Sequence, residues 1–249
     1  MWKISISTMK YAVKIVLSIW FLGAGSFLNA QHNSEKDNFR MKPKLTGTMY
    51  QKQNMYPGSE FLFDEWQTGT ITLKNGRQLK NMQLNYNAYT NDLVYAIDGN
   101  TAVVVSKFQV SDFIILNSTP ERKFILINGD IINKSFNSEM FVELLFNGNI
   151  TIFANRMMKV NSSLVMQNRF NESVYYLTNE YYACMGDYCF MTAQNKRNFY
   201  SFFNKVEVNK IIRKYNLNLK KENDLVEFAR QLNQLGKMAE IPRDLKQKQ

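Results

Sequence analysis

Four two-residue turn signals divide the middle of this sequence into short β-prone runs. Asn-Gly, Gly-Asn, Asn-Gly and Gly-Asp pairs occur at residues 75–76, 99–100, 147–148 and 186–187, and each lies between runs rich in Ile, Val, Leu, Phe and Tyr. Pairs of this kind are typical of β-hairpins, because their residues tolerate the positive φ angles of tight turns. The pattern therefore predicts an antiparallel β meander, folded as a sandwich, a curled sheet or a partly open barrel.

The first hairpin is predicted around Asn75-Gly76, which joins Thr70–Lys74 to Arg77–Tyr86. Asn-Gly is the preferred pair for a type I′ turn, in which both residues have positive φ. A two-residue loop would place Ile71 opposite a lysine, whereas the residues further along the second strand alternate strictly between apolar and polar. We therefore expect a β-bulge near Lys80-Asn81 that restores the alternation.

The other strands are expected on either side of the remaining turns and at two further apolar runs. Together they define a β region over residues 59–194. The expected strands are Leu93–Asp98, Thr101–Ser106, Phe108–Leu116, Phe124–Asn128, Phe141–Phe146, Asn149–Phe153, Val174–Met185 and Tyr188–Met191.

The hydrophobic period changes after Asn195. Apolar residues recur at i, i+3, i+4 and i+7 from Phe199, from Val208 and from Leu225, which is the period of an amphipathic helix. Gly236 is suited to the position that follows the last helix. We expect about three helices over residues 195–236, packed on the sheet or forming a small separate unit, and a polar tail at 237–249. The fold class is therefore α+β.

The N-terminal 30 residues have the three parts of a secretory signal peptide. Met1–Lys14 is basic and has no acid, and Ile15–Leu28 is an uncharged apolar run. Ala30 supplies the small residue that precedes a cleavage site, so we expect cleavage between Ala30 and Gln31. The apolar run is shorter than the about 20 residues that span a bilayer, although an uncleaved anchor is the alternative. The product is expected to be a soluble periplasmic or secreted protein that begins with a polar arm at residues 31–58.

The positive charge of the chain is concentrated at its C-terminal end. The formal net charge is +10, but residues 31–194 hold 15 basic and 15 acidic residues, whereas residues 195–249 hold 13 basic and 6 acidic ones. Nucleic acid is not an expected partner, because an exported protein rarely meets it. The basic end is interpreted as a solvated helical face, or as a contact for an envelope protein or an anionic envelope surface.

The two cysteines flank the last turn signal. In the run YYACMGDYCF the turn centres on Gly186-Asp187, so Cys184 lies directly opposite Cys189. In a non-hydrogen-bonded pair the two Cα atoms are about 4.5 Å apart, which a disulfide allows. Export would place the pair in an oxidising compartment. We therefore predict a disulfide between Cys184 and Cys189, with two buried free thiols as the alternative.

Several catalytic classes lack their residues in this sequence. His32 is the single histidine and lies in the polar arm, so nucleophilic triads, histidine zinc sites and histidine acid–base catalysis are not expected. Glycine-rich phosphate-binding motifs do not occur, and no cofactor or metal is expected. Paired carboxylates could serve a glycosidase, but the candidates lie near predicted turns or strand edges and are interpreted as solvated acids. These candidates are Asp64-Glu65, Asp130, and Glu139 with Glu143.

Five tyrosines near the last hairpin could line a groove for a sugar or a peptide. They are Tyr175, Tyr176, Tyr181, Tyr182 and Tyr188. Adjacent residues of a strand point to opposite faces, so at most one member of each neighbouring pair can meet a ligand. Ordinary packing of the sheet is the favoured interpretation, because tyrosine is common in strands.

Parts of the chain resemble a group of secreted proteins of unknown function from Bacteroidetes-type bacteria. The resemblance rests on a Gly58-Ser59 entry, the GTITLKNGR run at Gly69–Arg77, the LNYNAYTNDL run at Leu84–Leu93, and the basic helical end VNKIIRKYNLNLKKENDLVEFARQLN. It covers most of residues 58–235. The shared motifs are turn and core residues, so the resemblance implies a fold and no particular chemistry, and no functional residue is carried over.

These observations favour an exported, non-enzymatic binding or scaffolding module of the bacterial cell envelope. A binder of a small ligand such as a sugar, a lipid or a peptide, with a pocket between sheet and helices, is the alternative. A carboxylate-based hydrolase is a more distant third.

Overall fold

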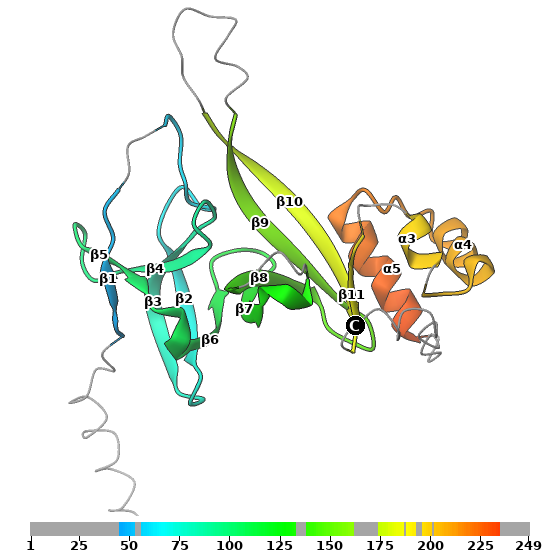
Figure 1. Cartoon of the computed structure of the whole chain (residues 1–249), viewed down its shortest axis with the longest axis horizontal. Helices are drawn as coiled ribbons and strands as arrows, with labels where there is room; N and C mark the ends of the chain where they lie inside the picture. The colour runs from blue at the N-terminus through cyan, green and yellow to red at the C-terminus, as the bar shows by residue number, and fades with distance from the viewer. Residues whose placement is uncertain are drawn as a thin grey trace, which may run out of the picture. The chain divides into compact units, whose positions relative to one another are not determined.

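The structure is a computed structural model that describes residues 45–52, 56–132, 138–161, 174–186, 188–192, 196–200 and 202–234. The expected signal peptide, its cleavage site at Ala30 and Gln31, and His32 lie outside these residues. The described chain forms one antiparallel sheet followed by a helical segment (Figure 1). Among the described helices, none has both the length and the apolar character needed to cross a bilayer.

Eleven strands form the sheet, which is not closed. Their order is β1-β5-β4-β3-β2-β6-β7-β8-β9-β10-β11, and every neighbouring pair is antiparallel. The predicted antiparallel, β-rich fold is therefore confirmed, as one sheet and not as the two layers of a sandwich. The strands are β1 Gly47–Met49, β2 Gln67–Leu73, β3 Gln78–Asn87, β4 Asp92–Ala96, β5 Ala102–Val105, β6 Val110–Ile115, β7 Arg122–Asn128, β8 Glu139–Phe146, β9 Thr151–Asn161, β10 Val174–Met185 and β11 Tyr188–Met191.

The sheet curls so that the end of β3 meets β9, although other strands lie between them in the sheet. The Met158 amide of β9 donates a hydrogen bond of 2.9 Å to the carbonyl of Ala88, just past β3. Nearby, the Tyr86 hydroxyl donates to the carbonyl of Arg156 over 3.4 Å. Inside the curl, Phe113 and Phe124 stack with ring centroids 4.7 Å apart, and both are fully buried. Burial of each such ring contributes about 1.5–3 kcal/mol, so this aromatic core holds the curl.

The first hairpin confirms the predicted bulge and corrects the predicted turn. Gly69 pairs with Met82 and Ile71 pairs with Leu79, so Lys80 and Asn81 together oppose a single residue of β2. Asn81 has a φ of 56°, as a bulge at this position allows.

The turn of this hairpin is not type I′, because of its two central residues only Gly76 has a positive φ, of 82°. The Asn75 side chain instead accepts a hydrogen bond from the Arg77 amide over 3.0 Å. The Leu73 amide donates to the Arg77 carbonyl over 2.9 Å, so the loop holds three residues. This longer loop shifts the register by one, and Ile71 faces Leu79 instead of Lys80.

The loop between β8 and β9 is longer than the predicted two-residue turn at Asn147-Gly148. β8 ends at Phe146 and β9 begins at Thr151. Two contacts with the helical segment explain the difference. Ile150 is buried among helical side chains, and the Asn149 amide donates to Asn233 Oδ1 over 2.7 Å.

Part of the expected polar arm belongs to the fold. Strand β1 pairs with β5 through Gly47↔Val105 and Met49↔Val103, and Leu45 just before it is buried. The three residues of β1, Gly-Thr-Met, show no alternation of buried and exposed side chains, because all three are exposed. Pairing with an existing edge, and not local pattern, therefore creates this strand.

Within its described residues, the helical segment has two helices of more than two turns, where about three were expected. These are α4, Lys205–Lys214, and α5, Glu222–Gln234; the five-residue α3, Lys196–Tyr200, is a single turn. The apolar run from Phe199 to Val206 is interrupted because the Asn204 side chain accepts from the Val206 amide over 2.8 Å and starts a new helix there. Val206 is consequently 74% exposed instead of continuing the stripe.

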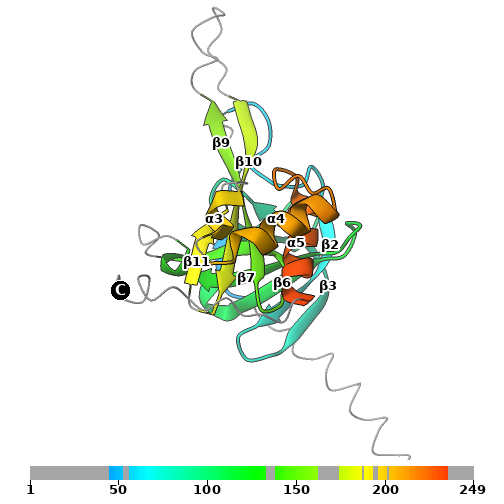
Figure 2. The ribbon, with the colours of Figure 1, turned by 90° about the vertical axis from the view of Figure 1, so that its right-hand side faces the viewer.

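A second core joins the helices to the sheet. Phe199, Leu225 and Phe228 are fully buried against the face of β9 and β10 that carries Ile152 and Ala183. The Phe199 and Phe228 rings meet edge to face at 4.9 Å. Helix α5 thus covers its apolar stripe against the sheet, and α4 packs against α3 and α5. Figure 2 shows the sheet behind the helices.

Candidate functional site

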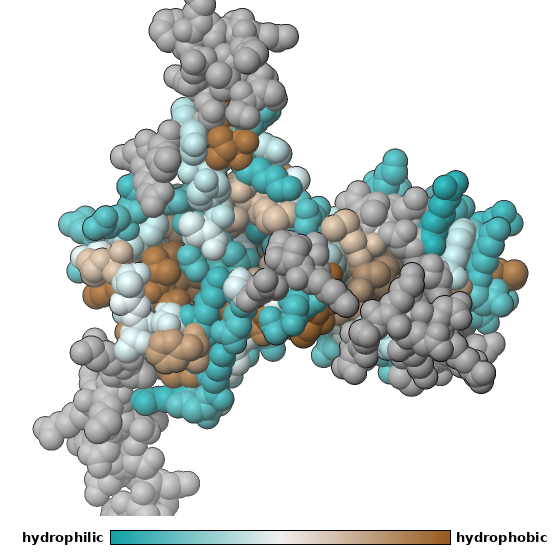
Figure 3. Space-filling model, in the orientation of Figure 1, coloured by the Kyte–Doolittle hydropathy of each residue, from teal (hydrophilic) through white to brown (hydrophobic). Residues whose placement is uncertain are grey.

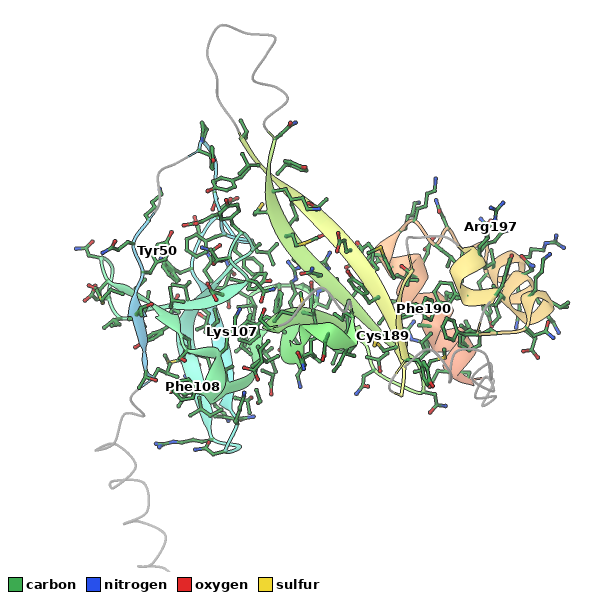
Figure 4. All side chains as sticks on the ribbon, viewed as in Figure 1. Tyr50, Lys107, Phe108, Cys189, Phe190 and Arg197 are labelled. Carbon is green, nitrogen blue, oxygen red and sulfur yellow. A yellow bond between two sulfur atoms is a disulfide. The ribbon has the colours of Figure 1, made fainter. Side chains whose placement is uncertain are left out.

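The last hairpin brings the two cysteines together. Cys184 of β10 pairs with Cys189 of β11, beside the Met185↔Tyr188 pair, and their Cα atoms are 4.1 Å apart. The two residues lie at disulfide distance and are joined by a disulfide bond (Figure 4). Cys184 is buried against Tyr182 and Val142 in an apolar cluster on the sheet face opposite the helices. The pair is therefore a local structural link and not an exposed redox group.

The five tyrosines near this hairpin do not form one surface. Tyr181 lies in the core under the helices, whereas its neighbour Tyr182 lies in the cluster on the other face, as the alternation of a strand requires. Tyr175 joins different partners, with ring centroids 5.6 Å from Tyr56 and 5.4 Å from Tyr89. Tyr181 and Tyr182 are thus packed in two separate clusters, as the favoured interpretation expects, and the five tyrosines do not line one groove.

The candidate carboxylates are likewise separated by their partners. Glu139 pairs with Lys74 over 2.8 Å at the surface. Asp64, Glu65 and Asp130 are exposed. Glu143 alone is buried, and both of its oxygens accept hydrogen bonds from arginines. An acid and a base facing each other across a cleft, which a glycosidase needs, are not formed by these residues.

Glu143 belongs to a buried ionic cluster between the two cores. Arg156 Nε donates to Glu143 Oε2 over 2.6 Å, and Arg156 Nη1 meets Glu222 Oε2 at 2.7 Å. Arg122 holds Glu143 with two hydrogen bonds, of 2.7 and 2.6 Å. The Tyr181 hydroxyl donates to Glu222 over 2.9 Å. The cluster joins β7, β8 and β9 to the first turn of α5.

The charges of this cluster balance and stabilise one another. Burial alone would raise the pKa of Glu222, but hydrogen bonding and charge attraction from Arg156 outweigh it and lower the pKa. Burial alone would lower the pKa of Arg156, yet Glu222 and Glu143 raise it. Burial, followed by the hydrogen bond to Glu222, raises the pKa of Tyr181. Each of the two glutamates is paired with an arginine, so the cluster can fix the helices on the sheet.

The outer side of α4 carries a basic helical face, defined here as Val206, Lys210, Arg213 and Lys214. These residues follow the i, i+4, i+7 and i+8 spacing of one helix side, and all four are exposed. The opposite side holds Val208 and Ile211, which are buried. Figure 3 shows mainly hydrophilic residues at this end of the molecule. Among the residues that the structure describes, no ion pair joins Lys210, Arg213 or Lys214 to an acid.

Sequence reasoning located the excess of positive charge but did not resolve this face. The 3.6-residue period of α4 contains the signal, because the basic residues alternate with the buried ones along the helix. The assignment of Val206 to the apolar stripe obscured it. No group of three or more potential metal ligands occurs within the described part of the chain.

Comparisons of the chain with models of known protein families, with curated proteins and with solved structures find no match.

Proposed function

We propose that this protein is an exported, non-enzymatic binding or scaffolding module of the bacterial cell envelope that attaches to an anionic lipid surface through its basic helical face. The observation that carries the proposal is the outward row of Lys210, Arg213 and Lys214, beside an exposed Val206. The resemblance to secreted proteins and the signal-peptide pattern support the compartment. Periplasmic and extracellular locations are both consistent with this role.

The packing of α4 supports a role for the face as a unit. Val208 and Ile211 bury the inner side of the helix, so the outer side has a fixed orientation. The three cations are therefore presented together without the entropic cost of ordering a flexible tail. Exposed Val206 and Tyr215 add apolar and aromatic groups of the kind that lie at a headgroup boundary.

The electrostatic magnitudes are sufficient for reversible attachment. Each Lys or Arg close to an anionic membrane contributes about 1 kcal/mol, and the contribution decays within a Debye length of about 10 Å at 0.1 M salt. Lys196, Lys220 and Lys221 are further exposed cations of the helical segment. Binding should therefore be measurable at low ionic strength and should weaken steeply with added salt.

Vesicle sedimentation tests the proposal with the processed protein. We expect binding to vesicles of phosphatidylglycerol and phosphatidylethanolamine, and much weaker binding to phosphatidylcholine alone. Lys210→Gln with Lys214→Gln should weaken anionic-vesicle binding about 30-fold, from the loss of about 2 kcal/mol.

The matched control is Lys52→Gln with Lys80→Gln, which removes the same charge from two exposed lysines outside the helical segment. This control should retain nearly all of the binding. An equal loss of binding in both double variants would show that net charge alone determines attachment. If the protein binds no anionic vesicle, attachment to a lipid surface is refuted, and an acidic envelope protein becomes the favoured partner.

The alternative function, a small-ligand binder with its pocket between sheet and helices, has less support. Fully buried Phe199, Leu225 and Phe228 occupy that interface. A ligand of drug-like size needs a cavity of roughly 300–1,000 Å³, whereas these buried side chains pack together where that pocket was expected.

A further inference from the structure

Glu60 is a buried carboxylate without a basic partner among the residues that the structure describes. Its residue is 7% exposed, and its carboxylate accepts a hydrogen bond from the Tyr50 hydroxyl. The eight ion pairs between described residues do not include it. Buried carboxylates are normally paired with a cation, because an unpaired buried charge is costly. Glu143, elsewhere in this protein, follows that rule with two arginines.

Tyr50 and Tyr175 lie beside this carboxylate, and two further tyrosine rings contact Tyr175. We use the name Glu60 cluster for Tyr50, Tyr56, Glu60, Tyr89 and Tyr175. The Tyr175 ring meets the Tyr56 and Tyr89 rings edge to face, at 5.6 and 5.4 Å. Burial and then the hydrogen bond to Glu60 raise the pKa of Tyr50, and burial and then the charge of Glu60 raise the pKa of Tyr175. Both raised pKa values favour the neutral phenols of Tyr50 and Tyr175.

Backbone contacts position the cluster, and one of its rings is exposed to solvent. The Ala88 amide donates to the Glu60 carbonyl over 3.0 Å, and the Tyr175 amide donates to the Pro57 carbonyl over 3.3 Å. Gly58 has a φ of 97°, and a Cβ there would lie 3.6 Å from the Cβ of Tyr175, so the loop packs closely on β10. Tyr89 is nevertheless 44% exposed. Tyr50 follows β1, on the side of the sheet away from the helices (Figure 4).

We propose that the Glu60 cluster is a binding site for an organic cation, the ammonium or guanidinium group of a ligand. Two observations favour a cation over a neutral ligand. The carboxylate lacks a counter-charge within the described residues, and the faces of tyrosine rings attract cations through their quadrupole. A charged donor would also form a strong hydrogen bond to the carboxylate. The site goes beyond the proposed attachment to lipid, because it recognises the opposite charge on a different part of the protein.

The cation could belong to a Lys or Arg side chain of a protein partner or to a free amine. The two sources share their chemistry and differ in what surrounds the charge. A side chain on a peptide would add contacts outside the cluster, with Trp66, which lies at the end of an aromatic row that runs from Tyr50 through Phe61. A free alkylamine would contact the cluster alone.

Titration calorimetry or chemical-shift perturbation with the processed protein tests the site. The probes are propylammonium, the acetylated amides of lysine and arginine, and the acetylated amide of norleucine as the uncharged match. We expect saturable binding of the cations in the millimolar range and none of the norleucine compound. Tighter binding of the amino-acid amides than of propylammonium would assign the site to a protein side chain, and equal binding would assign it to an amine.

Glu60→Gln is the decisive variant, because it removes the charge and retains an acceptor for the Tyr50 hydroxyl. It should weaken cation binding at least tenfold. The matched control, Glu65→Gln, removes an exposed carboxylate five residues away and should leave binding unchanged. Unaltered cation binding by Glu60→Gln would overturn the proposal, as would the absence of saturable binding to the unmodified protein.

A second pair of variants keeps the proposal testable if Glu60→Gln does not fold. Tyr89→Ala removes a ring of the cluster that is 44% exposed. Tyr176→Ala removes a ring of similar exposure, 45%, which lies on the face of β10 opposite to Tyr175. Tyr89→Ala should weaken cation binding at least threefold, and Tyr176→Ala should not. Equal effects of the two variants would contradict the site, and the vesicle binding of both should be unchanged.

Discussion

Arg156 of β9 and Glu222 of α5 are joined by an ion pair of 2.7 Å in the buried layer between the two cores. The arginine also donates to Glu143, so one guanidinium links two strands to a helix that lies 66 residues further along the chain. Only 6% of the Arg156 side chain is exposed. Loss of Glu222 would leave the buried Arg156 with Glu143 alone, and loss of Arg156 would leave Glu143 and Glu222 with one cation fewer, so changes at this pair should be costly.

Arg156→Leu should destabilise the protein by about 3–5 kcal/mol, because Glu222 loses its partner and Glu143 keeps only Arg122. Chemical denaturation followed by circular dichroism measures the change. Lys159→Leu on the same strand is the control, since its exposed pair with Glu180 at 3.8 Å should contribute at most about 1 kcal/mol. Equal effects would show that the buried cluster contributes no more than a surface pair.

Acid should weaken the attachment of the helices through Glu222. Its pKa is lowered in the folded protein, so the folded state favours the ionised form. The resulting stability is present above the pKa of an unfolded glutamate and is lost as the pH falls through the folded pKa. In denaturation between pH 7 and pH 3, Glu222→Gln should show a shallower loss of stability than the unmodified protein.

The control for this pH dependence is Asp64→Asn, which removes an exposed carboxylate. Its stability should follow that of the unmodified protein throughout the range. If Glu222→Gln has the same acid dependence as the unmodified protein, the ionised form of Glu222 contributes nothing to folding.

The Cys184–Cys189 disulfide closes a short loop, so it should add only about 2 kcal/mol. Cys184→Ala with Cys189→Ala should therefore fold, with a lowered denaturation midpoint. Reductant should lower the midpoint of the unmodified protein and leave that of the double variant unchanged. Mass spectrometry of the non-reduced exported protein checks the bond directly, since two alkylatable thiols would contradict it.

The helices should be necessary for a stable sheet, because their apolar side chains bury one face of β9 and β10 that would otherwise be exposed to solvent. A chain that ends at Gln194 should be insoluble or lack cooperative unfolding. Phe228→Ala tests the same interface in the full chain and should cost about 3–5 kcal/mol. Val206→Ala on exposed α4 should cost less than about 0.5 kcal/mol. Cooperative unfolding of the truncated chain at an unchanged midpoint would make the helices an independent unit.

Export is tested at the N-terminus. We expect the exported protein to begin at Gln31, after cleavage behind Ala30, and the terminal glutamine to be open to cyclisation. N-terminal mass spectrometry of the protein from the envelope fraction and the medium measures this. Recovery of intact Met1 on a membrane-associated form would instead support an uncleaved anchor.

The local features of the fold were predictable because they depend on neighbours in the chain. Strands β10 and β11 have the expected bounds, and the bulge at Lys80-Asn81 occurs where the alternation of apolar residues fails. The register of the Cys184↔Cys189 pair follows from the centre of its turn. The prediction failed where a distant contact competes with local preference. A two-residue turn was expected between β8 and β9, but Ile150 packs among the helical side chains and Asn149 is hydrogen-bonded to α5, so the loop is longer.

The sequence by itself determined the antiparallel strands, the change to helical period, the basic C-terminal end and the opposed cysteines, since each is encoded by residues a few positions apart. Only the tertiary structure decided the rest. Strand β1 exists because β5 offers it an edge. The ionic cluster joins Arg122, Glu143 and Glu222 from three elements. Glu60 lies close enough to Tyr175, 115 residues away, for its charge to raise the pKa of that tyrosine. Such contacts arise from the curl of the sheet and the docking of helices, and residues that meet in this way leave no local pattern in the chain.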